Sequence, residues 1–299
     1  MIYDVLIIGR GPAGISCAVY TVRASLKTLV IGKFDSSLLK AGGIENYYGF
    51  EEPIGGKELL MAGEKQLIRL GGEIREDEAT GIEKNDIFKV ICVNGTYEAR
   101  TVLLATGAPP VKAPVKGLER FEGRGISYCT TCDGFFYRGK KAGVLGYTDY
   151  AVHEALELIP FTKDVTLFTN GMPLEISEGN KAALSQFKIN TAKIREIRGN
   201  EAIEGLLLED GSQESLQGLF VAYGSASSVS FAQKMGIAVN GKSIQVNDKM
   251  ETNIPGLYSA GDCTGISRQV SAAVGQGAVA SRGIVETVRK MRKEMRKDG

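Results

Sequence analysis

Two segments of the sequence share one pattern, in which an apolar strand, a glycine-containing turn and a helix follow one another. The first runs from DVLIIG into PAGISCAVYTVRA, and the second runs from KAGVLG into DYAVHEALELI. A further apolar strand follows each helix, so each segment predicts a βαβ unit. Because such units build open parallel sheets that are covered by helices, the chain is expected to be an α/β protein with two doubly wound, Rossmann-like domains.

A glycine–aspartate pair near the end of the sequence indicates that the two domains are not simply consecutive. The pair occurs in SAGDC, far along the chain from the first glycine turn. If both segments contact one ligand, the first domain must be discontinuous. We therefore expect residues 1–113 and 244–299 to form one domain, and residues 114–243 to form a second domain that is inserted into the first.

The first glycine turn is a complete dinucleotide fingerprint, GRGPAG, between a strand and a helix. Gly9 permits the tight turn, Gly11 lets the backbone approach a pyrophosphate, and Gly14 allows the helix to pack closely on the strand. Pro12 and Ala13 stand at the start of the helix, whose free N–H groups favour a phosphate. The alternative is an ordinary glycine turn that binds no ligand.

The second glycine turn departs from this fingerprint. Its residues are Gly146, Tyr147, Thr148, Asp149, Tyr150 and Ala151. Thr148 stands where the approach of a pyrophosphate needs glycine, and its β-branched side chain adds bulk and restricts the backbone. Tyr147 adds a ring beside it. We therefore expect the second domain to keep the dinucleotide-binding fold without binding a nicotinamide nucleotide.

The chain has five cysteines, of which Cys129 and Cys132 form a C-x-x-C motif. An odd and sparse set does not make a structural disulfide framework, so we interpret this motif as a redox-active dithiol. One thiolate of such a pair attacks a partner disulfide, and the second thiol resolves the mixed disulfide. Asp133 follows directly and is a candidate proton shuttle, with a turn-forming residue before Gly134 as the alternative.

The other cysteines, the single histidine and the net charge argue against a metal site, a nucleic-acid partner and a membrane protein. Cys17, Cys92 and Cys263 occur in apolar or glycine-rich settings that are typical of inert buried thiols. A single histidine, His153, does not complete a zinc site, so no metal is expected. The net charge of +1 and the lack of long apolar stretches indicate neither a nucleic-acid partner nor a membrane span. The segment MIYDVLIIG has no signal-peptide pattern, so we expect a cytoplasmic protein.

Six segments, taken in order, resemble the low-molecular-weight thioredoxin reductase family over nearly the full length of the chain. They are GRGPAG, ENYYGF, ATGAPP, GRGISYCTTCDGFFYRGK, IPGLYSAGDC and RQVSAA. The resemblance implies a flavoprotein disulfide reductase fold, a noncovalent FAD, a homodimer, and a C-x-x-C motif that alternates between the flavin and thioredoxin. It also implies that Cys132 lies nearer the flavin, whereas the cysteine that first attacks thioredoxin stays open.

The resemblance assigns further FAD contacts outside the fingerprint. Asn46 would contact the flavin ring, and Asp262 would contact the ribityl chain or the pyrophosphate, with a turn cap as the alternative for Asp262. A helix that starts at Arg268 would direct its positive end to the pyrimidine side of the flavin and stabilise negative charge on the reduced ring. The other implied contacts are Gly32, Ala105, Thr106, Gly107, Gly261, Gln269 and Val270. Residues 36–39 depart from the family, since Ser-Ser-Leu-Leu replaces the usual Gly-Gly-Gln-Leu.

The segment after the strand KDVTLF lacks the cations that nucleotide-dependent members of the family use. Those enzymes grip the 2′-phosphate of NADPH with a His-Arg-Arg run and a further arginine, whereas residues 165–177 contain no arginine, lysine or histidine. The sequence therefore resembles the ferredoxin-dependent flavin thioredoxin reductases, and ferredoxin is the expected electron donor.

The basic tail TVRKMRKEMRKDG could steer an acidic ferredoxin, with a solvated helix end as the alternative. Two other functions stay open at this stage. One is an NAD(P)H-dependent thioredoxin reductase with an atypical nucleotide pocket. The other is a flavin and dithiol redox sensor that does not turn over.

Overall fold

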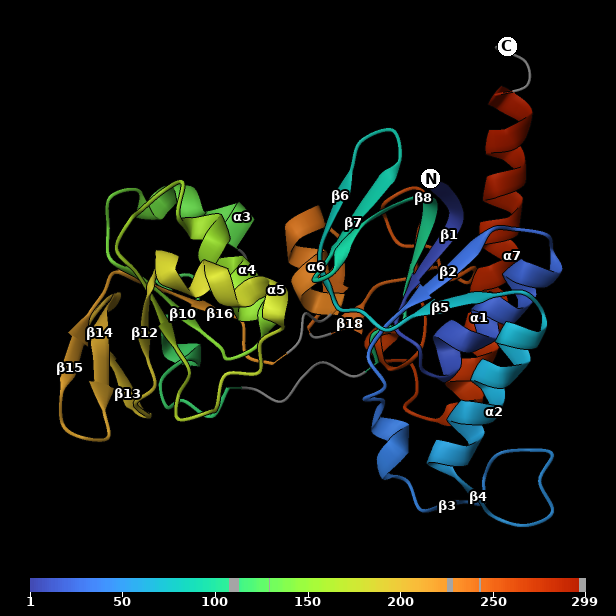
Figure 1. The fold of residues 1–299 in the computed structure, drawn as a ribbon, viewed down its shortest axis with the longest axis horizontal. Helices are drawn as coiled ribbons and strands as arrows, with labels where there is room; N and C mark the ends of the chain where they lie inside the picture. Colours follow the sequence, from blue (N-terminus) through green and yellow to red (C-terminus); the bar gives the residue numbers. More distant parts are fainter. Residues whose placement is uncertain (108–112, 129, 225–227, 242, 296–299) are drawn as a thin grey trace. The chain divides into compact units, whose positions relative to one another are not determined.

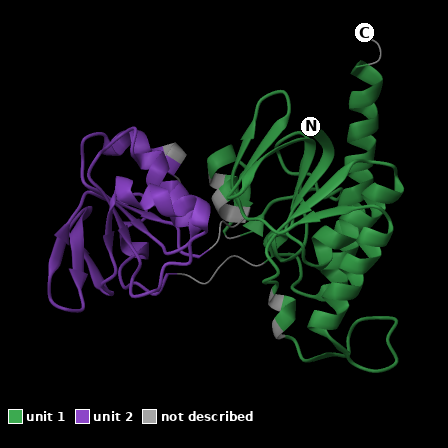
Figure 2. Ribbon diagram, viewed as in Figure 1, with its two compact units in different colours: residues 1–109, 227–299 green, residues 110–226 purple. Residues whose placement is uncertain are grey.

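The fold is that of a computed structural model, which describes residues 1–107, 113–128, 130–224, 228–241 and 243–295. The chain divides into two compact units (Figure 1, Figure 2). Unit 1 consists of Met1–Pro109 and Ser227–Gly299, and unit 2 consists of Pro110–Ala226. The chain therefore leaves unit 1, forms unit 2 and returns to unit 1.

Unit 1 is built on one sheet with the strand order β5-β2-β1-β8-β7-β6, in which β19 also pairs with β8. The parallel strands are β1 (Ile2–Ile8), β2 (Thr28–Ile31), β5 (Glu73–Arg75), β8 (Gly95–Leu104) and β19 (Leu257–Ser259). The antiparallel strands are β6 (Ala79–Lys84) and β7 (Phe88–Cys92). Val5, Leu6 and Ile7 are fully buried, because helices and strands cover both faces of a central parallel strand.

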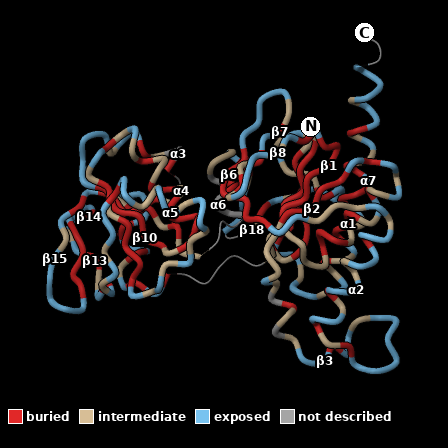
Figure 3. The backbone as a smooth tube through the Cα atoms, viewed as in Figure 1, coloured by how far each residue is buried: buried red, intermediate tan, exposed pale blue. Residues whose placement is uncertain are grey.

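In unit 1, helices from the start and from the end of the sequence pack against each other. The helix α1 (Pro12–Arg23) packs on α7 (Val270–Met295) and on α2 (Gly56–Arg69). The close approach of α1 and α7 requires Gly277, since a β-carbon there would lie 2.2 Å from the carbonyl oxygen of Ala13. Residues of β1, α1 and α7 form one buried apolar cluster (Figure 3).

Unit 1 also contains short elements, some of which lie just after the point where the chain returns to it from unit 2. They are η1 (Ser37–Lys40), β3 (Gly43–Ile44), β4 (Ile54–Gly55), α6 (Ser228–Met235), β17 (Val239–Asn240), β18 (Ser243–Ile244) and η5 (Asp262–Thr264). The return to unit 1 comes at Ser227, earlier than the expected residue 244, because α6 packs on β6 and the β17–β18 hairpin packs beside η5. At the other boundary, Ala113 belongs to unit 2, where it joins the buried apolar cluster around Phe121.

Unit 2 contains a second parallel sheet, with the order β12-β11-β10-β16-β9. Its strands are β9 (Ile126–Ser127), β10 (Ala142–Leu145), β11 (Val165–Phe168), β12 (Lys188–Asn190) and β16 (Gly218–Val221). A separate antiparallel sheet consists of β13 (Ile194–Gly199), β14 (Ile203–Leu208) and β15 (Gln213–Ser215). The helical elements are η2 (Glu119–Phe121), α3 (Thr130–Asp133), η3 (Gly134–Tyr137), α4 (Asp149–Leu158), α5 (Glu178–Lys181) and η4 (Ala182–Gln186).

The expected α/β class with two Rossmann-type units is confirmed by these two sheets and their covering helices. In unit 2, α4 packs on β10 and β11, as the second βαβ pattern predicts. None of the helices in the described residue ranges combines the length and the apolarity needed to cross a membrane.

Candidate functional site

The first dinucleotide turn is as tight as its glycines predict. Gly9 has a positive φ of 116°, and a β-carbon there would lie 2.1 Å from the carbonyl oxygen of Ala105. A β-carbon at Gly14 would lie 2.0 Å from the carbonyl oxygen of Gly9. Because packed backbone atoms cannot move aside, the fold itself requires glycine at both positions.

Gly11 has an open environment that these two glycines lack. The nearest atom that a β-carbon there would meet is Ser36 Oγ, at 3.8 Å. Gly11 is also the N-cap of α1, where Pro12 follows, no side chain caps the helix and the first turn holds no acidic residue. The first N–H groups of the helix, which have no partner within it, therefore lie beside open space at Gly11, which is an environment that suits a phosphate.

The Gly261–Asp262 turn lies against this same helix start. A β-carbon at Gly261 would lie 3.0 Å from the β-carbon of Ala13, and the Gly261 N–H donates to Gln276 Oε1 of α7 at 2.7 Å. Asp262 is half-buried, and burial raises the pKa of its carboxyl, whereas the positive charge of Arg268 opposes this shift. The fold thus brings the predicted fingerprint and the predicted Gly-Asp segment together.

A cavity of about 420 Å³ lies at the start of α7. Two predicted flavin contacts meet there, since Asn46 Nδ2 donates to Gln269 Oε1 at 2.9 Å. The lining residues are Leu38, Ala41, Gly43, Ile44, Glu45, Asn46, Arg268, Gln269 and Val270. Because α7 begins at Val270, the positive end of its dipole lies at this cavity.

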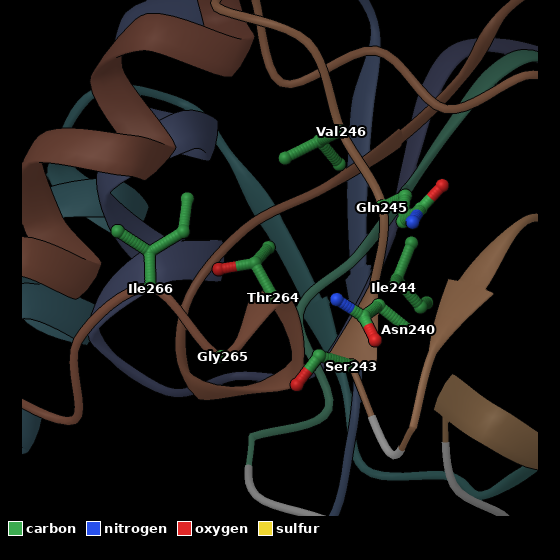
Figure 4. Close-up of a pocket in the computed structure, with 8 residues that line it drawn as sticks. All are labelled: Asn240, Ser243, Ile244, Gln245, Val246, Thr264, Gly265 and Ile266. Carbon is green, nitrogen blue, oxygen red and sulfur yellow. The ribbon is translucent and has the colours of Figure 1, made fainter.

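A second cavity, of about 510 Å³, lies between the β17–β18 hairpin and the residues that follow Asp262 (Figure 4). Its lining residues are Asn240, Ser243, Ile244, Gln245, Val246, Thr264, Gly265 and Ile266. Gly265 has a φ of 72°, and a β-carbon there would lie 2.1 Å from Ser243 Oγ, so the hairpin and the loop approach closely. Sequence analysis missed this cavity, because neither segment carries a recognisable motif.

The other predicted FAD contacts follow β2 and β8. A β-carbon at Gly32 would lie 3.0 Å from the backbone nitrogen of Arg10. Ala105, Thr106 and Gly107 come directly after β8, and Gly107 has a positive φ of 77° with no atom within 4 Å of an added β-carbon. The backbone at Gly107 therefore has open space beside it, at the carboxyl end of a parallel strand, where such sheets bind their ligands, whereas Gly32 is packed closely on Arg10.

Arg10 is a residue of this region that sequence analysis did not single out. Its guanidinium donates two hydrogen bonds to the Glu64 carboxylate, at 2.7 and 3.0 Å, and lies 5.0 Å from the centre of the Phe34 ring. The departure at residues 36–39 has a local structural role, because Ser36 Oγ accepts the Leu38 N–H at 3.3 Å and caps η1.

The predicted dithiol lies at the short helix α3 of unit 2. Cys129 falls outside the described residues, and the backbone of Cys132 belongs to α3. The Ser127 hydroxyl donates to Asp133 Oδ2 at 2.7 Å and so orients the predicted proton shuttle. The Thr130 N–H, at the start of the helix, donates to Glu154 Oε2 at 3.2 Å.

Sequence analysis also did not identify two aromatic side chains that follow α3 in the chain. Phe135 and Phe136 are 61% and 65% exposed, and their rings pack edge to face with centroids 6.2 Å apart. They form an exposed aromatic pair on η3, directly after the segment that carries the C-x-x-C motif. The signal in the sequence was the FF pair in CDGFFYRG.

The three other cysteines lie apart from this chemistry. Cys17, Cys92 and Cys263 are buried free thiols. Burial raises the pKa of the Cys17 and Cys92 thiols, so both are poor nucleophiles.

The second glycine turn is closed by its own neighbours. The Thr148 hydroxyl donates to the Gly224 carbonyl at 2.5 Å, and Thr148 is only 6% exposed. The Glu175 N–H donates to the Tyr147 carbonyl at 2.8 Å, which lays the chain after β11 alongside the turn. The Tyr147 ring packs edge to face on Tyr223, with centroids 5.1 Å apart. The turn therefore contacts chain segments on both sides.

Asp149 adds a negative charge at the start of α4, where a pyrophosphate would bind. The carboxylate is 5% exposed and accepts hydrogen bonds from Ser177 N–H at 3.1 Å, Ser177 Oγ at 3.0 Å and Asn180 Nδ2 at 2.7 Å. A carboxylate here occupies the positive end of the helix dipole, to which a pyrophosphate would be attracted. Sequence analysis found the bulk of Tyr147 and Thr148 but not this carboxylate.

Comparison with known proteins places these features in a family. Residues 3–277 match the model of the pyridine nucleotide-disulphide oxidoreductase family. The thioredoxin reductases of Bacillus subtilis (strain 168) and Treponema pallidum (strain Nichols) are 32% and 35% identical to this chain, with coverage of 99% and 93% of this chain and 98% and 95% of those proteins.

Two solved structures are similar over almost the whole chain. The atypical thioredoxin reductase from Desulfovibrio vulgaris Hildenborough has a TM-score of 0.93 and 39% identity, covering 96% of this chain and 98% of that one. A ferredoxin-flavin thioredoxin reductase from Clostridium acetobutylicum has a TM-score of 0.73 and 34% identity, covering 97% and 99%. The chain therefore belongs to the pyridine nucleotide-disulphide oxidoreductase family, in its thioredoxin reductase group, whose members are FAD flavoproteins.

Proposed function

We propose that this flavoprotein reduces thioredoxin with electrons that it receives from ferredoxin, without a nicotinamide nucleotide. The observation that carries the proposal is the closed second turn of unit 2. Protein atoms occupy both sides of that turn, through the Thr148–Gly224 and Tyr147–Glu175 hydrogen bonds. A dinucleotide would have to displace these bonds and the buried Asp149 carboxylate.

The charges near the turn also oppose a pyridine nucleotide. Glu175 lies close enough to Tyr147 that its charge contributes to a raised pKa of the tyrosine hydroxyl, after the larger effect of burial. An NADPH 2′-phosphate needs arginine in this region, and residues 165–177 supply none. The ferredoxin-flavin thioredoxin reductase of Clostridium acetobutylicum is a similar structure whose name states a different electron source.

Unit 1 fits the FAD that the family carries. Gly11 and the first turn of α1 would hold the pyrophosphate, and Asp262 would hold the ribityl chain. Asn46 and Gln269 would contact the flavin ring beside the start of α7. When bound, FAD can accept electrons one at a time from an iron–sulfur carrier and supply a pair for a disulfide.

The remaining roles fall to unit 2. Cys129 and Cys132 would exchange with thioredoxin, and Asp133, oriented by Ser127, would hold or release the accompanying proton. The exposed Phe135 and Phe136 would contact thioredoxin, because they lie directly after α3.

The energetics favour this direction of electron flow. A plant-type ferredoxin has a potential of about −400 mV and thioredoxin one of about −270 mV. The difference of about 130 mV corresponds to roughly 6 kcal/mol for two electrons.

The basic tail has a smaller role in the proposal than the sequence suggested. Helix α7 has 26 residues, which at 1.5 Å per residue is about 39 Å. Its first residue lines the predicted flavin cavity, whereas Arg289 and Lys290 lie at the far end and Arg292 is paired there with Asp4 at 2.6 Å. The tail can steer an acidic carrier from a distance, but a carrier docked on it would sit too far from the flavin. The proposal also includes a homodimer, because of the family resemblance, and a cytoplasmic location, because the first residues lack a signal-peptide pattern.

Anaerobic mixing tests the electron donor. The oxidised holoenzyme is mixed in parallel with NADPH, NADH and reduced ferredoxin, while flavin absorbance and thioredoxin thiols are followed. We expect ferredoxin alone to bleach the flavin and to sustain thioredoxin reduction. Bleaching by either nucleotide at the turnover rate would refute the ferredoxin assignment. A flavin and a dithiol that are reduced without turnover of thioredoxin would favour the redox sensor instead.

A further inference from the structure

The carboxyl end of β2 departs from the usual dinucleotide-binding fold. In that fold, an acidic residue about 20 residues after the glycine turn accepts a hydrogen bond from the adenosine ribose. Residues 29–34, which stand at this spacing, read LVIGKF, and none of them is acidic. The ammonium group of Lys33 can donate hydrogen bonds but cannot accept one from a hydroxyl. An acceptor for the ribose must therefore come from another part of the chain.

Glu76 brings a carboxylate to this place from the neighbouring strand. β5 runs parallel to β2, with Arg75 opposite Ile31, so the two strands end at the same edge of the sheet. The Gly32 N–H donates to the Arg75 carbonyl at 3.3 Å, and Glu76 is the next residue. Glu76 thus stands beside Gly32, at the edge where β1 also ends in the first glycine turn.

Arg10, which belongs to the first glycine turn, connects Glu76 to that turn. Its Nη1 donates to Glu76 Oε2 at 3.3 Å and to the Gly32 carbonyl at 3.5 Å. The Glu76 side chain is 71% exposed, so a ligand can reach it. Because a carboxylate has about four acceptor positions, Glu76 can keep its bond to Arg10 and accept further hydrogen bonds.

The other carboxylates near this edge are less suited to bind a ribose. Both oxygens of Glu64 accept hydrogen bonds from Arg10, and Glu78 is buried and paired with Lys33. Asp35 is exposed, but among the described residues no hydrogen bond or ion pair joins it to the glycine turn. Contact with the turn and accessibility to a ligand are combined in Glu76.

We propose that Glu76 binds the adenosine ribose of FAD, in place of the acidic residue that β2 lacks. The ribose hydroxyls donate to the Glu76 carboxylate, and Arg10 is the positioning residue that holds this carboxylate beside the turn. FMN has no adenosine, so Glu76 makes the site selective for the dinucleotide. The inference goes beyond the proposed function, since it concerns recognition of the cofactor and is independent of the electron donor.

The sign of one effect distinguishes this role from a bystander charge. A carboxylate near the pyrophosphate that binds no part of FAD repels it, so its removal should leave FAD affinity unchanged or raise it. Removal of a carboxylate that accepts ribose hydrogen bonds should lower the affinity, because hydrogen bonds to charged groups are strong.

The test measures flavin binding by the full chain after its flavin has been removed. The protein is titrated with FAD, and separately with an FAD analogue whose adenosine ribose lacks both hydroxyls, while flavin fluorescence is followed. Glu76→Ala removes the proposed acceptor, and Glu76→Gln keeps an oxygen but removes the charge. Asp35→Ala is the matched control, because it removes another exposed carboxylate close to the end of β2.

We expect Glu76→Ala to weaken FAD binding about tenfold, Glu76→Gln to weaken it less, and Asp35→Ala to stay within about twofold of wild type. With the analogue, Glu76→Ala should bind within about twofold of wild type, because the hydroxyls are missing. Unchanged or tighter FAD binding in Glu76→Ala overturns the inference, as does an equal loss in Asp35→Ala or with the analogue. Should Glu76→Ala not fold, the same comparison of the two ligands in Glu76→Gln decides.

Discussion

Two substitutions in the first glycine turn separate the requirements of the fold from those of the cofactor. In Gly14→Ala, the new methyl group would lie 2.0 Å from the carbonyl oxygen of Gly9 and would have to retreat by about 1 Å or more. Overpacking of this kind costs about 1–3 kcal/mol, and a contact this close with backbone belongs at the upper end of that range. The gain of about 1 kcal/mol from alanine in a helix offsets part of the cost. We expect a net loss of about 2 kcal/mol.

Gly11→Ala should behave in the opposite way. Its φ of −81° and ψ of −175° suit alanine, and the nearest atom is 3.8 Å away. Loss of glycine at an N-cap costs at most about 1 kcal/mol. The added methyl group lies where a pyrophosphate would approach, so FAD affinity should fall at least about tenfold, or about 1.4 kcal/mol.

The assay combines thermal unfolding of the FAD-free protein with a titration of FAD. With about 2–4 °C lost per kcal/mol in a unit of this size, Gly14→Ala should lower the unfolding temperature by about 4–8 °C. Gly11→Ala should lower it by no more than about 4 °C. Normal FAD affinity in Gly11→Ala would refute the placement of the pyrophosphate, and a normal unfolding temperature in Gly14→Ala would refute the packing argument.

Two further predictions concern Asp262 and the aromatic pair. Burial raises the pKa of the Asp262 carboxyl in the folded state above its value in the unfolded state. The FAD-free protein therefore loses stability as the pH rises from the unfolded pKa through the folded pKa. Asp262→Asn should unfold at a higher temperature than wild type at pH 7, and this difference should vanish as the pH of the measurement is lowered. A constant difference at every pH would contradict this cause. Phe136→Ala should raise the KM for thioredoxin about fivefold, since exposed aromatic anchors contribute more than about 1 kcal/mol, and should leave the unfolding temperature unchanged. The measurement is steady-state kinetics. Phe50→Ala is the control, because Phe50 is an aromatic residue that is 46% exposed in unit 1. The docking role is contradicted if both variants have the KM of wild type.

The sequence alone was sufficient to predict the local parts of the molecule. The spacing of Gly9, Gly11 and Gly14 predicts a tight turn between strand and helix, because the backbone conformation of a turn depends on the residues within it. Tyr147 and Thr148 predict a crowded second turn, because the size of a side chain can be read from the sequence without knowledge of the fold. Alternating strands and helices likewise predicted both sheets.

Contacts between distant segments were decided only by the tertiary structure. The pairs Asn46–Gln269, Gly261–Ala13 and Thr130–Glu154 join residues whose neighbourhood depends on the packing of whole elements. The return to unit 1 at Ser227 has the same origin, because the boundary depends on the packing of α6 on β6 and no local motif marks it. Asp149 is the clearest example of what sequence analysis could not predict. Its residue type can be read from the sequence, but its three hydrogen-bond donors come from a segment beyond the next strand. Local conformation is set by nearby residues, whereas burial and hydrogen-bond partners exist only once the chain has folded.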